Sequence, residues 1–406
     1  MSGKWPGGFI NKTAPTVVGP VDGEGGSASG IWTLDQAADY EKQGLWPMPI
    51  LDKELYSWGN NSVGQLGLGD TATRSSPVQV GALVTWSEVK GAMYGIHALA
   101  TKTDGTLWSW GDGSSGQLGL GDLLPRSSPV QIGALTTWYK MAGGYTAGTA
   151  IKTDGTLWSW GENSRGTLGL NNTTNYQSPV QVGALTNWSG IVMGAYHCIA
   201  VKTDGTLWTW GYNNYGQLGL GDITNRSSPV QVGALTTWLQ AAAGYFHTLA
   251  VKTDGTLWSW GRASFGQLGQ GSTTSYSSPV QVGALTTWLN VSAGLYSGYA
   301  VKTDGALWSW GYNGQGALGQ GNTTNYLSPV QVGALTDWLQ AAAGYQFCIT
   351  TKTDGTLWSW GANNHGQLGQ GDTTARSSPV QVGALTNWKK DSISCSRDSG
   401  YSILKT

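Results

Sequence analysis

One ten-residue pattern, in which an Asp-Gly pair precedes alternating apolar side chains, dominates this chain. It reads Lys-Thr-Asp-Gly-Thr-Leu-Trp-Ser-Trp-Gly at 102–111, and its near copies, including a half copy at the front, occupy 55–59, 152–161, 202–211, 252–261, 302–311 and 352–361. Asp-Gly between two β-prone segments predicts a hairpin with a two-residue type I′ turn, in which both central residues have positive φ. Trp108 and Trp110 are two residues apart, so they face the same side of their strand. We expect both rings to pack between neighbouring units of the repeat.

The pattern recurs with a nearly fixed period over residues 51–406. Its seven Trp-Gly pairs are separated first by 52 residues and then by 50, and they begin at 58, 110, 160, 210, 260, 310 and 360. Each unit also holds a Gly-rich loop, a strand of the Ser-Pro-Val-Gln type and a further Trp before an Ala/Gly segment. Four short strands in each unit predict an all-β fold, a seven-bladed β-propeller.

The two ends of the periodic region complete one another. Leu404-Lys405-Thr406 matches the residues before an Asp-Gly turn, and 52–59 matches the residues that follow one. We therefore expect the chain ends to pair within a shared seventh blade, which would close the propeller and remove its open edges.

Residues 1–50 differ in kind from the repeats. Gly, Pro, Thr and Ser dominate 11–29, as in an extended arm. Thr33 and Gln36 fit a capping box, which predicts one short helix at about 34–43. We expect the arm to be an assembly segment that binds through apolar anchors, namely Trp5, Trp32, Leu34 and Trp46.

The composition favours a β-rich globular protein without catalytic chemistry. The chain has 63 Gly and 23 Trp, a net charge of -1 and scattered Lys and Arg, so no basic face for nucleic acid is visible. Its three Cys have unrelated spacings, and neither a membrane-spanning apolar run nor the apolar segment of a signal peptide is present. The Asp of each Asp-Gly pair is explained by its role in the turn. The Lys two residues before it is explained by a position at a solvated strand end. We expect no enzyme, no metal site and no cofactor.

Two recurring motifs resemble those of a known family. Gly-Tyr-Asn-Asn-Tyr-Gly-Gln-Leu-Gly at 211–219 and Ala-Gly-Tyr-Phe-His-Thr-Leu-Ala-Val at 243–251 resemble the two signatures of the regulator of chromosome condensation (RCC1) repeat. The resemblance covers residues 51–406 and implies a seven-bladed propeller. Members of this family act as nucleotide-exchange factors for a small GTPase or bind chromatin, and a secreted bacterial relative inhibits β-lactamase.

The family's exchange activity relies on a protruding wedge, for which the spacings of 52 and 50 residues leave no room. The family's histidine is present in three units and replaced in four. In chain order, the residues expected at this position are His97, Ala147, His197, His247, Ser297, Phe347 and Gly400.

Nearly identical units differ most in two windows, one after each Trp-Gly pair and one around the family histidine. A two-residue turn after Thr203 places His197 opposite Tyr212, and the same count places His247 opposite Arg262. Both windows then share the blade end away from the Asp-Gly turns. Aromatic residues and Arg supply contact energy at interfaces, so we expect a recognition face composed of Tyr212, Tyr215, Phe246, His247, Arg262, Phe265, Tyr296 and Tyr312. The alternative is drift at exposed loops, with the propeller acting as a spacer.

The first 50 residues resemble leader segments of proteins from environmental phage and marine microbial sequences. The main hypothesis is therefore a non-enzymatic structural or adhesive protein of a phage virion or extracellular assembly. Its arm would bind other copies or other virion proteins, and its propeller would bind an unknown surface protein or glycan. The alternative hypothesis is an intracellular, cytoplasmic protein-binding propeller, such as a small-GTPase regulator.

Overall fold

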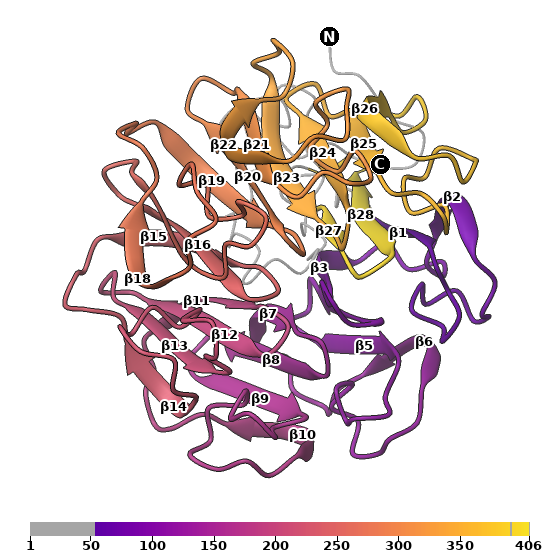
Figure 1. Ribbon diagram of the computed structural model, residues 1–406. Helices are drawn as coiled ribbons and strands as arrows, with labels where there is room; N and C mark the ends of the chain where they lie inside the picture. Colours follow the sequence, from indigo (N-terminus) through magenta and orange to yellow (C-terminus); the bar gives the residue numbers. More distant parts are fainter. Residues whose placement is uncertain (1–52, 390–391, 406) are drawn as a thin grey trace, which may run out of the picture. The chain divides into compact units, whose positions relative to one another are not determined.

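The computed structural model describes residues 53–389 and 392–405, which form seven four-stranded antiparallel sheets arranged as the blades of a propeller (Figure 1). The all-β, seven-bladed prediction is confirmed. Six blades are continuous in sequence, and each consists of four consecutive strands that run in order from the central channel outward. Blade by blade, the strands are β3 (Trp86–Gly91), β4 (His97–Lys102), β5 (Leu107–Gly111) and β6 (Arg126–Gln131); β7 (Trp138–Gly143), β8 (Ala147–Lys152), β9 (Leu157–Gly161) and β10 (Tyr176–Gln181); β11 (Trp188–Met193), β12 (His197–Lys202), β13 (Leu207–Gly211) and β14 (Arg226–Gln231); β15 (Trp238–Ala243), β16 (His247–Lys252), β17 (Leu257–Gly261) and β18 (Tyr276–Gln281); β19 (Trp288–Ala293), β20 (Ser297–Lys302), β21 (Leu307–Gly311) and β22 (Tyr326–Gln331); and β23 (Trp338–Ala343), β24 (Phe347–Lys352), β25 (Leu357–Gly361) and β26 (Arg376–Gln381). The predicted arm and its helix at about 34–43 lie outside the described residues.

The seventh blade combines both ends of the described chain. Its strands, again from the channel outward, are β27 (Ser394–Cys395), β28 (Ser399–Lys405), β1 (Lys53–Gly59) and β2 (Arg74–Gln79). In this sheet Leu55 lies opposite Ile403, and Trp58 lies opposite Gly400. The first and last strands of the propeller are therefore direct neighbours.

Tryptophan side chains join every blade to the one before it. The second Trp of each motif is fully buried and donates its indole N–H to a backbone carbonyl of the preceding blade. These bonds measure 2.7 to 2.9 Å and join Trp58 to Gln367, Trp110 to Gln65, Trp160 to Gln117, Trp210 to Thr167, Trp260 to Gln217, Trp310 to Gln267 and Trp360 to Ala317. Glycine permits the close approach: Gly219 has a φ of 72°, and a Cβ there would lie 2.7 Å from the Trp260 Nε1. The expected packing of this Trp between blades is thus present in all seven units.

The Asp-Gly hairpins differ from the prediction in their turn. Lys202 N–H donates to the Thr206 carbonyl at 3.0 Å, so the loop has three residues, of which only Gly205 has positive φ (76°). The Asp204 carboxylate accepts the Thr206 N–H at 2.9 Å and the Thr206 hydroxyl at 2.6 Å, which stabilises a type I turn followed by a left-handed glycine. The type I′ prediction is wrong, and the hairpin register shifts by one residue.

The register shift changes which residues face each other across the hairpin. His197 lies opposite Gly211, not Tyr212, and His247 lies opposite Gly261, not Arg262. In the seventh blade, Gly59 pairs with Ser399. Ser399, not Gly400, therefore occupies the position of the family histidine.

The motif lysines are not on solvated strand ends, as the sequence suggested. Lys202 is only 6% exposed, and its Nζ lies 3.6 Å from the ring centre of Trp208 and 4.8 Å from that of Trp188. The same stacking recurs at Lys102 and Lys252. A cation over two indole rings is favourable when it is partly desolvated, so these lysines belong to the packing of each blade.

One repeat unit lacks an indole hydrogen bond that the neighbouring units make, so units with and without this bond can be compared within the same chain. In the repeat with Thr206, the Trp208 indole N–H donates to the Thr206 hydroxyl at 2.9 Å. The equivalent residue Ala306 has no hydroxyl, and the Trp308 indole nitrogen is buried without a partner. We expect Ala306→Thr to raise the free energy of unfolding by about 1 kcal/mol, and Thr206→Ala to lower it by a similar amount. Urea unfolding measures both, and a destabilised Ala306→Thr protein would contradict the assignment.

Candidate functional site

Two sets of loops meet at the blade end away from the Asp-Gly turns, which we call the loop face. One set joins the first strand of a blade to the second, and the other joins the third strand to the fourth. Backbone hydrogen bonds of 2.8 to 2.9 Å run between them, from Tyr212 N to the Tyr196 carbonyl and from Arg262 N to the Phe246 carbonyl. The two variable windows are therefore adjacent, although the predicted pairing across the hairpin was one residue off.

Aromatic rings on the loop face form an unbroken series across four successive blades, which we call the aromatic arc. Successive ring centres lie 4.3 to 6.5 Å apart. The arc consists of Tyr145, Tyr196, Tyr212, Tyr215, Phe246, Tyr245, Tyr296, Phe265 and Tyr312. Tyr145 and Tyr215 are exposed by 36% and 37%, and the other rings are half-buried. The arc thus combines mutual ring support with partial access to solvent.

Two arginines are inserted among these rings. The Arg165 guanidinium carbon lies 4.1 Å from the Tyr196 ring centre and 5.5 Å from that of Tyr212. Arg262 lies 5.1 Å from the Tyr215 ring centre and 5.4 Å from that of Tyr296. Stacking of this kind holds each guanidinium in place while leaving its edge available.

The two arginines differ in whether a carboxylate lies beside the guanidinium. Arg165 lies 4.0 Å from Glu162, whose carboxylate also accepts the Thr146 and Ser164 hydroxyls at 2.6 Å. Within 53–389 and 392–405, Arg262 has no acidic partner, and its Nε donates to the Ser264 hydroxyl at 2.9 Å. Arg262 is therefore a positive charge held among aromatic rings, with no carboxylate partner in the described part of the chain.

Tyr94 lies beneath the arc and was missed in the sequence. It is 1% exposed, its hydroxyl donates to the Gly294 carbonyl at 2.9 Å, and its ring centre lies 5.1 Å from that of Tyr245. Burial raises the pKa of Tyr94 well above its usual range. The sequence did mark this position, because the first two Trp-Gly pairs are 52 residues apart and the later ones 50. The two extra residues lengthen the loop that joins β3 to β4, and Tyr94 lies within this insertion.

His247 does not belong to the recognition face that we predicted. Its ring is fully buried and lies beside Gly244, where a Cβ would be 2.0 Å from the imidazole. Burial lowers the pKa of His247 and His97 to about 4 and that of His197 to about 3. These histidines therefore remain neutral at pH 7 and fill the space beneath the loop face. Of the predicted site residues, Tyr212, Tyr215, Phe246, Phe265, Tyr296 and Tyr312 lie in the arc, and Arg262 is inserted in it.

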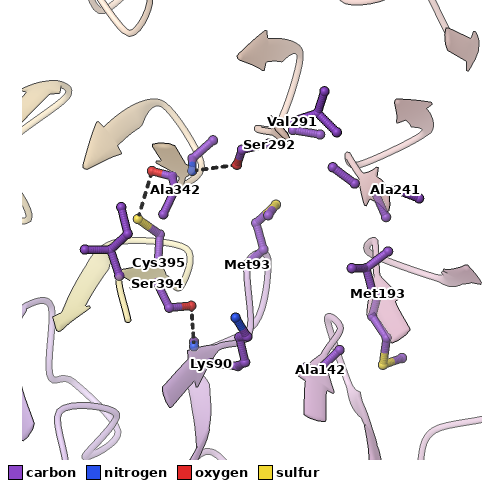
Figure 2. Close-up of a pocket in the computed structure, with 18 of the residues that line it drawn as sticks. Lys90, Met93, Ala142, Met193, Ala241, Val291, Ser292, Ala342, Ser394 and Cys395 are labelled. Carbon is purple, nitrogen blue, oxygen red and sulfur yellow. Dashed lines mark hydrogen bonds between the residues drawn. The ribbon is translucent and has the colours of Figure 1, made fainter. Parts of the chain in front are cut away.

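The central channel of the propeller forms a pocket (Figure 2). It has a volume of about 180 Å³ and is lined by the innermost strands, largely through Ala, Val, Met and Ser. Lys90, which lines it, is paired with Glu88 at 3.0 Å, and the Ser292 and Ser394 hydroxyls accept backbone N–H groups at 3.1 and 3.0 Å. The Cys395 thiol also lines the channel and donates to the Ala342 carbonyl at 3.4 Å. No cluster of three or more metal-ligating side chains occurs in the described parts of the chain.

The sequence matches a described family over most of its length. The model of the regulator of chromosome condensation (RCC1) repeat matches residues 52–92, 104–151, 154–201, 204–251, 254–301, 304–350 and 354–400. A second RCC1 repeat model matches 188–217, 238–267 and 338–367. Among the residues that the structure describes, no helix has the length and apolar character needed to cross a bilayer.

Solved structures share the fold at low sequence identity. Human WBSCR16 superposes with a TM-score of 0.78 at 20% identity, covering 87% of this chain and 99% of that chain. Yeast RCC1 (Prp20), in a crystal structure with Kap60, gives a TM-score of 0.77 at 20% identity, covering 88% of this chain and 90% of that chain. These similarities support the propeller fold alone.

Curated relatives match over shorter stretches. The ultraviolet-B receptor UVR8 of Arabidopsis thaliana is 38% identical over 85 residues, which cover 21% of this chain and 19% of that protein. The probable E3 ubiquitin-protein ligase HERC3 of Homo sapiens is 38% identical over 87 residues, covering 21% of this chain and 8% of that protein. The chain thus aligns with less than a fifth of the length of these two relatives.

Proposed function

Because this chain belongs to the regulator of chromosome condensation (RCC1) repeat family, we propose that it is a protein-binding propeller whose aromatic arc contacts the partner. The observation that carries the proposal is the unbroken series of partly exposed rings with Arg165 and Arg262 inserted among them. Tyr and Arg are enriched among the residues that dominate binding energy at protein interfaces. Rings held by their neighbours also lose little conformational entropy when a partner binds.

The comparisons favour a protein partner over the virion hypothesis. Prp20 has been crystallised with Kap60, and another study of it concerns its binding properties to Gsp1p and histones. The named relatives give no support to a virion or extracellular role. The intracellular alternative is therefore the better proposal, and a small-GTPase regulator is one protein of this kind. The assembly role of Trp5, Trp32, Leu34 and Trp46 stays a prediction, because these residues lie outside the described part of the chain.

Differential affinity capture tests the proposed surface. Wild type, a Tyr215→Ala/Phe265→Ala variant and a Tyr139→Ala control are immobilised at equal density and exposed to extract of the source cells. Tyr139 is a suitable control because it is a 55%-exposed tyrosine at the other end of its blade. Lys202 and Lys252 are unsuitable, since both stack on tryptophans.

We expect the arc variant to bind the captured protein about 30-fold or more weakly, because aromatic anchors each contribute about 2 kcal/mol or more. Tyr139→Ala should bind like wild type. Circular dichroism melting confirms that each variant is folded. Equal binding by wild type and the arc variant, or loss only with Tyr139→Ala, would place the partner elsewhere.

A further inference from the structure

We propose that the aromatic arc recognises a proline-rich segment in the polyproline II conformation, with an acidic residue that pairs with Arg262. This inference rests on the proposed function and specifies the chemistry of the partner. It is drawn from the hydrogen-bonding character of the arc, the orientation of its rings and the environment of Arg262.

The polar groups that the arc offers to a ligand include four tyrosine hydroxyls. The hydroxyls of Tyr212, Tyr215, Tyr296 and Tyr312 make no hydrogen bond to any described residue, so each can donate its proton to a ligand. The Glu162 carboxylate already accepts the Thr146 and Ser164 hydroxyls. A fitting ligand presents acceptors to the free hydroxyls and to Arg262. Each proline in a peptide has a carbonyl that can accept and no N–H that would itself need a partner.

The rings are inclined to one another rather than stacked flat. The planes of Tyr212 and Tyr215 make an angle of 69°, and those of Phe265 and Tyr312 an angle of 67°. The pyrrolidine rings of a polyproline II helix pack against aromatic surfaces of this kind. Such a helix is already extended before binding, so little conformational entropy is lost when it docks.

Arg262 gives the segment its charge preference. Its guanidinium is held between the rings of Tyr215 and Tyr296, and only the Ser264 hydroxyl bonds to its Nε. The remaining N–H groups can form a two-pronged contact with a carboxylate. A neutral saccharide fits less well, because it would leave the Arg262 charge without a carboxylate partner. An acidic proline-rich segment satisfies both the charge and the donor groups.

The experiment uses the full chain and fluorescence anisotropy with labelled synthetic peptides. One peptide is a run of prolines followed by two glutamates. In the second, glutamines replace the glutamates, and in the third, Gly and Ser replace the prolines. We expect the proline–glutamate peptide to bind at least about tenfold more tightly than the Gly/Ser peptide of equal charge.

Variants separate the contributions of ring, hydroxyl and charge. Phe265→Ala should weaken binding of both proline peptides about tenfold or more, and Tyr139→Ala should weaken neither. Tyr215→Phe keeps the ring, so its expected loss of about threefold to fivefold reports the hydroxyl alone. Arg262→Gln should remove the preference for glutamate over glutamine without affecting folding.

Three results would overturn the inference. These are equal binding of the Gly/Ser and proline peptides, absence of binding by both proline peptides, and unchanged glutamate preference in Arg262→Gln. None of them removes the proposed function: if the Tyr215→Ala/Phe265→Ala variant still loses the captured protein, the arc binds a partner of different chemistry.

Discussion

A chain that ends before β28 is expected to lose cooperative unfolding of the propeller. This strand lies between β27 and β1 in the seventh blade, so its removal leaves β27 without a neighbouring strand and β1 paired with β2 alone. It also removes Tyr401 and Ile403, whose side chains are fully buried. Loss of buried side chains of this size costs about 2–5 kcal/mol each, and the lost strand pairing adds to this. The total approaches the 5–15 kcal/mol of net stability that is typical of a folded domain.

Removal of 399–406 should therefore give a broad, non-cooperative melt or association through the open sheet edges. Differential scanning calorimetry with analytical ultracentrifugation measures both effects. The matched control is Tyr401→Phe, which keeps the ring and removes only the hydroxyl bond of 2.8 Å to the Gln65 carbonyl. The control should remain cooperative and lose about 1 kcal/mol. A truncated monomer with the wild-type melting curve would show that β28 does not close the ring.

Acidification from pH 7 to pH 5 is expected to destabilise the propeller by several kcal/mol. The pKa values of His97, His197 and His247 fall to about 4, 3 and 4 in the folded state, because burial disfavours their charged form. An unfolded histidine has a pKa of about 6.5 and binds a proton first as the pH falls. The contribution of the three buried neutral histidines to the free energy of unfolding is complete above about pH 6.5 and declines as the pH falls toward 4. At pH 5 the loss is about 2 kcal/mol per histidine.

The chain supplies a substitution that isolates one histidine. Phe347 occupies the position of His247 in another blade and lies against Gly344 as His247 lies against Gly244. We expect His247→Phe to fold and to reduce the pH-dependent loss by about one third. Urea unfolding at pH 7 and pH 5 measures this change, since carboxylates with lowered pKa values respond only at lower pH. An identical loss in wild type and variant would contradict the role assigned to buried neutral histidine.

The repeats made the architecture predictable because each unit gives the same evidence independently. The period and the Trp-Gly pairs predicted seven blades, and near-identical units exposed the variable positions as a group. The hairpin register was not predictable at this level. Asp-Gly is compatible with both a two-residue and a three-residue loop, and the choice depends on the bonds from Thr206 to Asp204.

The residues of the candidate site were predicted in part for a similar reason. Variation identified Tyr212, Tyr215 and Phe265, but it could not distinguish an exposed ring from a buried one. His247 varies between units because it fills a buried space that Phe347 can also fill. Tyr94 lies in an insertion without a counterpart, so the 52-residue spacing marked its position but no equivalent residue in another unit indicated its role.

Site-specific photo-crosslinking tests the central claim most directly. A benzophenone amino acid is placed at Phe265 in the aromatic arc or at Tyr139 at the opposite blade end, and each protein is irradiated with the captured partner. If the arc binds the partner, crosslinks form from position 265 and not from position 139. Crosslinks from position 139 alone would contradict the assignment of the binding surface to the arc.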